Sequence, residues 1–471
     1  MTLAATAQLD VLETFRVPYA VEGEPPLGVS GRLASLRGAE LLWVAPGSST
    51  VRRWHRVAEM PLFAAVATDA AVRRGLDASG RNWRPTDPVT DSAGEVVAHV
   101  WSDSDGSALL PFDPNAVVRA FLREEYVDAD GAVARGATAL ARKLYYRLRP
   151  ALPRAVQIDM RRRFARIQER APFPSWPAEP ALHDFYGYLL RLVEGVLAAP
   201  LPWIAPWPTP HEWAVVLTHD VEREAGYRHV GHMVALERRL GVRSAWYFVP
   251  ERDYTVEPGL VRSLAEGGFE IGVHGLRHDG RDLAEGEFER RLSAMRAYGE
   301  SWGAVGFRAP ATHRSWERMQ QLGFAHDSSY ADVARYEPQS GGSCSLLPFF
   351  LGGLVELPIT LPMDHTLFEL LDEEDGRVWF EKASFVRERG GMALLLTHPD
   401  YLLDPIRLAE YERFVAHVGG DSSAWLALPR DVADWWRRRA ASKLEPSGAL
   451  WRISGPAAGE ARVVMGVSGL T

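Results

Sequence analysis

Five polar residues stand at the carboxyl ends of successive strands predicted in the second half of the sequence. Aspartate and histidine can bind a divalent metal or exchange a proton, and arginine can hold a nearby carboxylate in its ionised form. Parallel strands that close into a β/α barrel bring their carboxyl ends to one face, where active sites are built. We therefore expect these residues, far apart in the chain, to converge on one site. They are Asp220, His274, Arg308, Asp327 and His398.

A pair of carboxylates, Asp220 and Glu222, follows the apolar run Val215, Val216 and Leu217. On an extended strand, residues i and i+2 point to the same side. Two neighbouring carboxylates repel each other, and a cation between them removes that repulsion. The pair therefore indicates a metal site. The alternative is structural, with Asp220 capping the helix that the sequence predicts further on.

A pair of histidines, His274 and His278, follows the third predicted strand with His-x-x-x-His spacing. This spacing places two imidazoles on one side of a helix or tight loop. Zinc favours such nitrogen donors, and it often takes a carboxylate as its third ligand and leaves a position for water. A second pair, His229 and His232, lies on a predicted exposed helix, and we interpret it as structural.

The remaining three polar residues each allow two interpretations. Arg308, just before Ala309 and Pro310, could keep a base carboxylate ionised or form an interior salt bridge. His398, as a member of a convergent set, favours a general acid rather than a buried structural histidine. Asp327 could orient that histidine or cap the turn at Ser328 and Ser329.

Short apolar runs and helix-length amphipathic stretches alternate through this half of the chain. Such alternation predicts a parallel sheet with right-handed crossovers. About seven such units favour an irregular (β/α)7-type barrel over an open sheet. The expected strands are 215–218, 244–249, 269–274, 304–308, 355–360, 392–397 and 425–428.

The domain organisation is predicted from a segment with four prolines at residues 201–210, which stiffen the chain into an extended connector. Before it, short apolar runs between Pro/Gly turns and later helical stretches favour a mixed α/β domain of unknown role. The predicted parts are residues 1–200 (amino-terminal α/β domain), 201–212 (linker), 213–442 (barrel) and 443–471 (short β-rich tail).

The composition is that of a soluble protein with material for large cores: 471 residues, 46% hydrophobic and 24% charged. A net charge of −8 argues against nucleic acid as a partner. The basic run at residues 161–163 is either a solvated helix face or an anion site.

Membrane insertion and secretion are not expected. The longest apolar stretch, residues 185–201, is broken by Arg191 and Glu194, so it does not read as a membrane span. The amino terminus lacks the basic and apolar regions of a signal peptide, and the single Cys344 cannot form an internal disulfide. We expect a cytoplasmic protein.

Residues 210–440 resemble the polysaccharide deacetylase domain, also known as the NodB-homology domain or carbohydrate esterase family 4. Five segments look like the family's motifs in the family's order, and the resemblance covers about half the chain. They are Thr218-His219-Asp220-Val221-Glu222, His274-Gly275-Leu276-Arg277-His278, Arg308-Ala309-Pro310, Asp327, and Leu396-Thr397-His398.

The resemblance implies a metal-dependent hydrolase that removes acetyl groups from an acetylated sugar or glycoconjugate. It makes Asp220 the general base and His398 the general acid, with Arg308 paired to the base. It assigns one divalent metal, zinc first and cobalt or nickel as alternatives, to Glu222, His274 and His278. The backbone N–H of Ala311 would stabilise the oxyanion.

Three departures from the family pattern bear on these assignments. Glu222 stands one residue later than the usual aspartate, His219 replaces an aromatic residue, and Ala311 stands where a tyrosine often follows the proline. Two other functions compete with sugar deacetylation: a C–N hydrolase acting on a non-sugar amide, and a non-catalytic module that binds a glycan or partner. The retained Asp220 and His398 argue against the binding module, because binding needs neither a base nor an acid.

Overall fold

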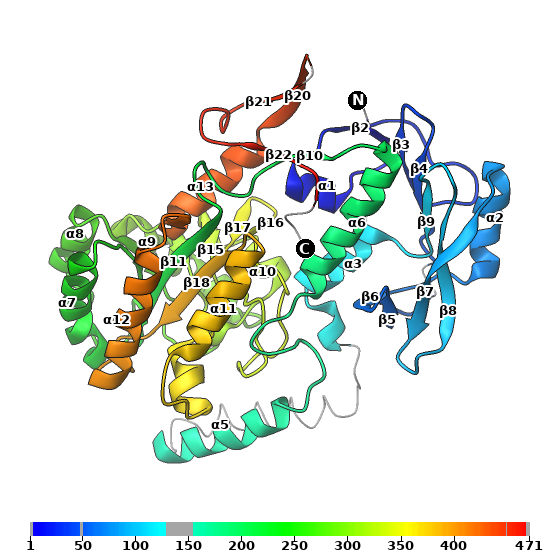
Figure 1. The fold of residues 1–471 in the computed structure, drawn as a ribbon. Coiled ribbons are helices and arrows are strands. Elements are labelled where there is room, and N and C mark those ends of the chain that lie inside the picture. Colours follow the sequence, from blue (N-terminus) through cyan, green and yellow to red (C-terminus); the bar gives the residue numbers. More distant parts are fainter. Residues whose placement is uncertain (1–2, 48–49, 129–153, 449, 468–471) are drawn as a thin grey trace. The chain divides into compact units, whose positions relative to one another are not determined.

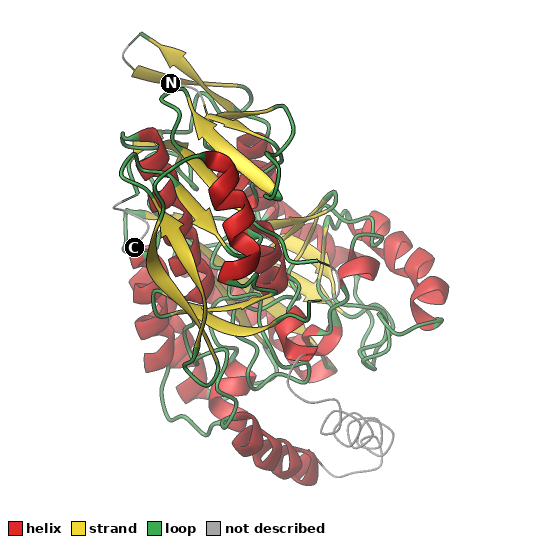
Figure 2. Cartoon of the chain, turned by 90° about the vertical axis from the view of Figure 1, so that its right-hand side faces the viewer, coloured by secondary structure: helices red, strands yellow, loops and turns green. Residues whose placement is uncertain are grey.

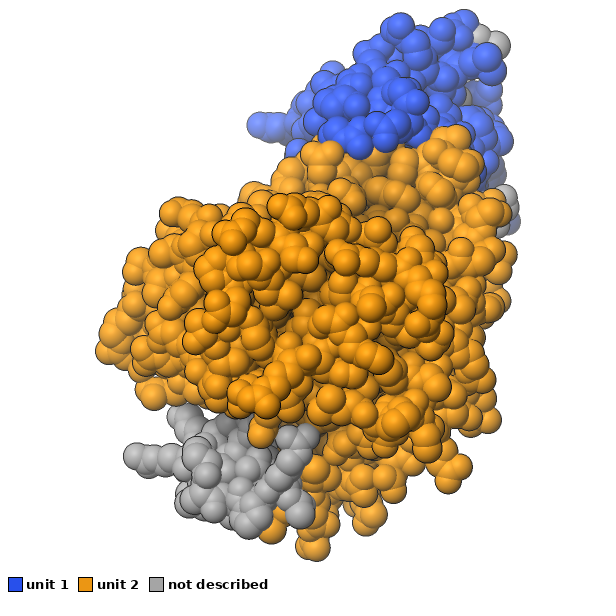
Figure 3. Space-filling view, turned by 90° about the vertical axis from the view of Figure 1, so that its left-hand side faces the viewer, with its two compact units in different colours: residues 1–132, 180–205, 438–471 blue, residues 133–179, 206–437 orange. Residues whose placement is uncertain are grey.

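The computed structural model describes residues 3–47, 50–128, 154–448 and 450–467 (Figure 1). These residues form two compact units, coloured in Figure 3. Unit 1 contains residues 3–128, 180–205 and 438–467, and unit 2 contains residues 154–179 and 206–437. The units alternate along the chain, and the domain boundaries inferred from the sequence stay a prediction.

Unit 1 is a mixed α/β unit with a nine-stranded sheet in the order β2-β1-β3-β4-β9-β8-β7-β5-β6. Leu42, Val72 and Leu109 are among the residues that pack its core. The strands are β1 (Leu3–Ala5), β2 (Tyr19–Val21), β3 (Gly31–Ser35), β4 (Glu40–Trp43), β5 (Arg53–Val57), β6 (Met60–Ala64), β7 (Arg84–Asp91), β8 (Val96–Ser102) and β9 (Ala108–Leu110).

The helices of unit 1 include α3, which begins where Pro114 fixes the first turn and the Asp113 side chain accepts a hydrogen bond from the N–H of Asn115. Two strand pairs complete the unit: β10 with β22, and β20 with β21, both antiparallel. The bounds are α1 (Asp10–Phe15), α2 (Asp69–Ser79), α3 (Pro114–Leu122), η1 (Glu125–Asp128), α6 (Ala181–Leu197), β10 (Pro202–Ile204), β20 (Lys443–Ser447), β21 (Leu450–Ser454) and β22 (Val463–Met465).

Unit 2 is built on a second nine-stranded sheet, in the order β16-β17-β15-β14-β13-β12-β11-β18, with β19 also paired to β11. Every pairing is parallel except that of β16 with β17. The strands are β11 (Trp213–Val221), β12 (Ala245–Phe248), β13 (Glu270–Val273), β14 (Gly306–Phe307), β15 (His326–Asp327), β16 (Phe349–Leu351), β17 (Leu354–Glu356), β18 (Met392–Thr397) and β19 (Ala424–Leu426).

The central strand β11 explains why this sheet forms. All of its residues are buried, and its apolar run is typical of a parallel strand covered on both faces. Helices of unit 2 pack against the strands of this sheet, and Figure 2 draws the helices of the chain in red and its strands in yellow. The helices of unit 2 are α5 (Arg154–Gln168), α7 (Glu224–Arg239), α8 (Pro258–Glu266), α9 (Glu287–Trp302), η3 (Pro310–Thr312), α10 (Trp316–Met319), the π-helical turn η4 (His365–Leu370), α11 (Arg377–Glu388), α12 (Pro405–Gly419) and α13 (Pro429–Ala440), which runs on into unit 1.

Local sequence signals set the ends of these helices. The Asp404 side chain accepts hydrogen bonds from the N–H groups of Ile406 and Arg407, and Pro405 occupies the first turn of α12. Helix α9 ends at Gly303, whose φ of 65° is left-handed and favours glycine. Such signals fix where each crossover helix returns the chain to the sheet.

The sheet confirms the α/β class, and one of its strands overlaps each of the seven ranges expected from the sequence, although β17 ends at Glu356, before the expected Thr360. Two further strands, β15 and β16, join it, so the (β/α)7 arrangement itself stays a prediction. The N–H groups of Thr360 and Leu361 both donate to the carbonyl oxygen of Leu394, which links the segment after β17 to β18. Among the described residues, every helix falls short of the length and apolarity that crossing a membrane requires.

Candidate functional site

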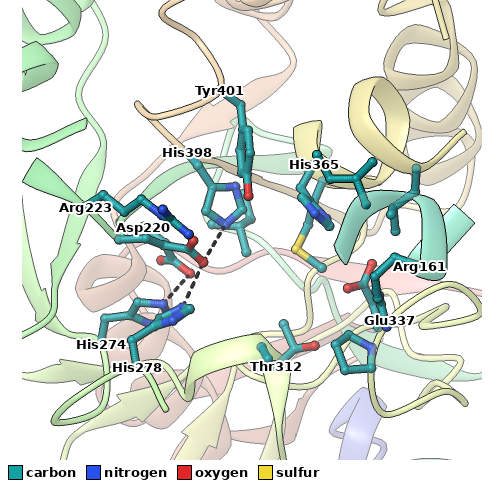
Figure 4. A pocket seen from close by; sticks show the side chains of 17 residues that line it. Arg161, Asp220, Arg223, His274, His278, Thr312, Glu337, His365, His398 and Tyr401 are labelled. Atoms are coloured by element: carbon teal, nitrogen blue, oxygen red, sulfur yellow. Dashed lines mark ion pairs between the residues drawn. The ribbon is translucent and has the colours of Figure 1, made fainter. Parts of the chain in front are cut away.

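A cavity of about 120 Å³ opens at the carboxyl ends of the strands of unit 2 (Figure 4). The end of β11 supplies Asp220 and Glu222, the loop after β13 supplies His274 and His278, and the loop after β18 supplies His398. Of the five residues predicted to converge, Asp220, His274 and His398 line this cavity, whereas Arg308 and Asp327 are not among its lining residues.

Glu222, His274 and His278 form the group best suited to hold a metal ion. One potential ligand atom from each residue lies within 4.8 Å of the other two. His278 Nε2 is 2.8 Å from Glu222 Oε1, yet neither His278 Nε2 nor His274 Nε2 makes a hydrogen bond. Buried nitrogens that lie close to a carboxylate but form no hydrogen bond are typical of side chains that bind the same cation. Two histidines and one carboxylate are a ligand set that suits zinc.

The backbone fixes which nitrogen of His274 faces the cavity. His274 Nδ1 donates to the carbonyl oxygen of Arg308 at 3.1 Å, because that oxygen can only accept. Nε2 is therefore the unprotonated nitrogen of the neutral ring. Burial lowers the pKa of His274 to about 4, which favours the neutral form that a metal ligand needs.

The loop carrying the two histidines is strained in a way that positions them. His278 has a φ of 52°, a conformation rare outside glycine. Gly275 has a φ of 61°, and a Cβ there would meet Asp282 Oδ2 at 2.2 Å and Pro310 Cδ at 2.6 Å. Strain of this kind gathers at functional sites, where the surrounding packing has to hold it.

Asp220 is buried and lies between a cation and the metal-ligand group. Its Oδ1 accepts a hydrogen bond from Arg308 Nη1 at 2.9 Å, and its Oδ2 is 3.5 Å from His274 Nε2. The predicted contact between Arg308 and Asp220 is thus present. A carboxylate in this place lies beside the group that could hold a metal.

Arg308 lies behind the cavity lining and is held on every side. Its Nε donates to the carbonyl oxygen of Ser328 at 2.7 Å, its Nη2 to Ser328 Oγ at 2.9 Å, and its Nη1 also to Thr218 Oγ1 at 3.0 Å. The ring of Tyr247 lies 4.4 Å from the guanidinium carbon. A Cβ at Gly272 would meet that ring at 2.3 Å, so glycine is required there.

His398 lies across the cavity from the two metal-site histidines (Figure 4). Its Nδ1 is hydrogen-bonded to Asp364 Oδ1 at 2.7 Å, and its backbone N–H donates to Asp364 Oδ2 at 2.7 Å. Its Nε2 lies 3.8 Å from Glu222 Oε1. Burial alone would lower the pKa of His398, but the nearby carboxylates, Asp364 first and then Glu222 and Asp220, together outweigh burial and raise that pKa to about 10. A histidine with such a pKa carries a proton at neutral pH.

Asp327 does not hold His398. Its Oδ2 accepts from the N–H of Ser329 and its Oδ1 from Ser329 Oγ, each at 3.0 Å, which is the turn-capping alternative. The residue lies behind the lining next to Ser328, which supports Arg308. The interpretation that Asp327 orients the histidine is wrong, because Asp364 occupies that place.

Ala311 lies in the cavity wall with a φ of 56°, and Thr312 beside it has a φ of 49°. Within the described residues, the N–H of Ala311 makes no hydrogen bond. A free backbone N–H at the lip of the cavity is what an oxyanion donor requires.

Three further residues bear on the site: Asp364 and Asp400 were missed from the sequence, and Arg161 was named only as part of a basic run. Asp364 follows the loop after β17, and its place beyond a predicted strand end was the signal that could have identified it. Asp400, two residues after His398, accepts from the N–H groups of Glu222 and Gly226 and so fixes the start of α7. Arg161 reaches the cavity from α5, and the sequence carries no signal of that contact.

No protein-family model and no curated protein matches the chain. Similar solved structures include a protein from Mycobacterium smegmatis assigned as a polysaccharide deacetylase, 22% identical with a TM-score of 0.39, covering 52% of this chain and 96% of its own. A second, from Pseudomonas aeruginosa PAO1 and assigned to the same class, is 20% identical with a TM-score of 0.41, covering 50% and 94%.

A third similar structure is the allantoinase PuuE, 18% identical with a TM-score of 0.39, covering 50% of this chain and 93% of its own. The similarity covers about half of this chain.

Proposed function

We propose that this cavity hydrolyses the acetamide of an N-acetylated sugar or glycoconjugate with the help of one divalent metal, zinc first and cobalt or nickel as alternatives. Glu222, His274 and His278 would hold the metal. One observation carries the proposal. The buried carboxylate of Asp220, hydrogen-bonded to Arg308, and the imidazole of His398, hydrogen-bonded to Asp364, both lie beside this group. Such a carboxylate can accept a proton, and such a histidine can donate one.

The chemistry divides between the metal and the residues of the chain. When bound, the metal would polarise the acetamide carbonyl and lower the pKa of a water. Asp220 takes the proton from the attacking water, and Arg308 keeps Asp220 ionised. The N–H of Ala311 donates a hydrogen bond to the oxyanion that forms.

Collapse of the tetrahedral intermediate requires a proton on the departing nitrogen. His398 donates it from Nε2 as the C–N bond breaks, and Asp364 accepts the hydrogen bond of Nδ1 and stabilises the imidazolium beforehand. The products are acetate and the free amine. A module that only binds a glycan would gain nothing from two groups poised in opposite protonation states.

The test is release of acetate from a panel of acetylated sugars, nucleotide-linked sugars and simple non-sugar amides. We expect acetate from at least one sugar, loss of that activity in His398→Gln, and retention in His229→Gln, whose histidine lies on α7 outside the cavity lining. Hydrolysis of the non-sugar amides alone would show a C–N hydrolase of different specificity. Binding of sugars without any acetate release would contradict catalysis.

A further inference from the structure

Three consecutive arginines on α5 differ in the partners that they meet. Arg162 Nη2 is 2.7 Å from Asp372 Oδ1, and Arg163 Nε is 2.9 Å from Asp159 Oδ2. Arg161 forms no ion pair with any residue that the structure describes, and its Nη2 donates only to the carbonyl oxygen of Tyr336 at 3.0 Å. One of three chemically identical side chains is therefore left without a counter-charge.

Arg161 is also the one that lines the cavity. It lies, with Glu337, on the wall opposite Asp220, His274 and His278 (Figure 4). Arg161 as a whole residue is half-buried. A guanidinium does not lose its charge in a protein, and burying an uncompensated charge is costly. A ligand that brings a negative charge to this wall would offset that cost.

An acidic residue of the same cavity wall, Glu337, does not form an ion pair with Arg161 in the described structure. Glu337 Oε1 instead accepts a hydrogen bond from Thr366 Oγ1 at 2.7 Å. Burial raises the pKa of Glu337, although the Thr366 hydrogen bond and the Arg161 charge oppose that shift. The Arg161 guanidinium is therefore left without an ion-pair partner on this wall.

A second arginine adds positive charge to the cavity. Arg223 follows Glu222 and lines the same cavity, and it has no ion pair within the described ranges. In Figure 4 it lies near Asp220 on the side away from Arg161. Two unpaired guanidinium groups thus face one small cavity, in a chain whose net charge is −8.

We propose that Arg161 binds an anionic group, a phosphate or a carboxylate, on the substrate, which is therefore a negatively charged N-acetylated glycoside. The inference rests on the proposed function and deepens it. The planar guanidinium can donate two parallel hydrogen bonds to such a group from Nη2 and a neighbouring nitrogen, because the hydrogen bond to Tyr336 uses only one of the two N–H groups of Nη2. Helix α5 comes from the chain before the barrel strands, so this segment takes part in choosing the substrate.

The experiment compares three substrates that share the acetamide and differ in charge: N-acetylglucosamine, N-acetylglucosamine 1-phosphate and N-acetylmuramic acid. For the wild type we expect kcat/KM to be about 10- to 100-fold higher for at least one anionic substrate, the range for hydrogen bonds to a charged group. Preference for both anions assigns a general anion site, and preference for one identifies the phosphate or the carboxylate.

The matched variants are Arg161→Gln and Arg163→Gln on the same helix. Arg161→Gln should bring the ratio of anionic to neutral kcat/KM close to 1, mainly through KM, and Arg161→Lys should retain part of it. Arg163→Gln should keep the wild-type ratio, because Arg163 is exposed and paired with Asp159. Circular dichroism and thermal unfolding verify that each variant is folded.

A binding measurement separates this inference from the proposed function. Glucosamine 1-phosphate carries no acetyl group, so calorimetry can follow its binding without turnover. Binding that weakens about tenfold in Arg161→Gln but not in Arg163→Gln supports the anion site even if no substrate releases acetate. Two outcomes would contradict the anion site: acetate release with equal kcat/KM for neutral and anionic substrates, and a preference for anions that Arg161→Gln retains. Neither outcome would contradict the proposed deacetylase activity.

Discussion

The link between Asp364 and His398 gives a prediction whose size can be worked out from the structure. Replacing Asp364 by asparagine removes the carboxylate that raises the pKa of His398 to about 10, while keeping the side-chain size and an oxygen for the backbone N–H. The pKa should then fall towards the ordinary histidine value of about 6.5. At pH 8 the protonated fraction would drop from about 99% to about 3%, so kcat should fall roughly 30-fold.

The same arithmetic makes the loss depend on pH. At pH 5.5 about 90% of a histidine with a pKa of about 6.5 is protonated, so the two proteins should then differ less than about twofold. The assay is acetate release from one accepted substrate across this range, with Asp372→Asn as the control, because the Asp372 carboxylate is exposed and pairs with Arg162. A ratio of wild-type to variant rates that stays constant from pH 5.5 to 8 would refute the reasoning, because Asp364 would then act on geometry alone.

Four further predictions follow from the site. Asp220→Asn should keep its metal, measured by elemental analysis, but lose about 100- to 10,000-fold in kcat; unchanged turnover would exclude Asp220 as the base. His278→Ala should lower metal affinity more than His232→Ala does, as followed by competition with a chromophoric chelator. Arg308→Ala should destabilise the fold by about 3–5 kcal/mol in denaturant titrations, because it leaves the buried Asp220 charge uncompensated. The folded-state pKa of His398 lies above its unfolded value of about 6.5, so its stabilisation is complete below that pH and is lost as pH rises through about 10. The difference in Tm between wild type and Asp364→Asn should therefore shrink with rising pH.

The strand-end residues could be predicted from the sequence, because parallel strands bring residues at their carboxyl ends to the same edge of the sheet. Each buried run that ended in a polar residue placed that residue at the same face, so Asp220, His274 and His398 converge as expected. The position after a strand could not decide whether Asp327 or Asp364 contacts His398, because both aspartates follow strands. Asp327 caps its own turn, whereas Asp364 precedes the π-helical turn η4, a shape without a periodic signature, and reaches His398.

The contribution of α5 shows a different limit. Helical periodicity predicts that a face exists, but it does not say which distant loop that face meets. The run at residues 161–163 carries three identical charges, and only packing against the loops near Tyr336 and Glu369 separates Arg161 from its neighbours. The sequence favours a solvated face for this run and leaves an anion site as the alternative, and the partner of each arginine separates the two interpretations.

Titration of metal-free protein with zinc tests the central claim most directly, when bound metal and acetate release are measured in the same samples. We predict that the rate rises in proportion to bound zinc, levels off at one ion per chain, and fails to rise in a Glu222→Gln, His278→Ala double variant. Acetate release at full rate without metal, or one bound ion per chain with no acetate released from any acetylated sugar, would contradict the account.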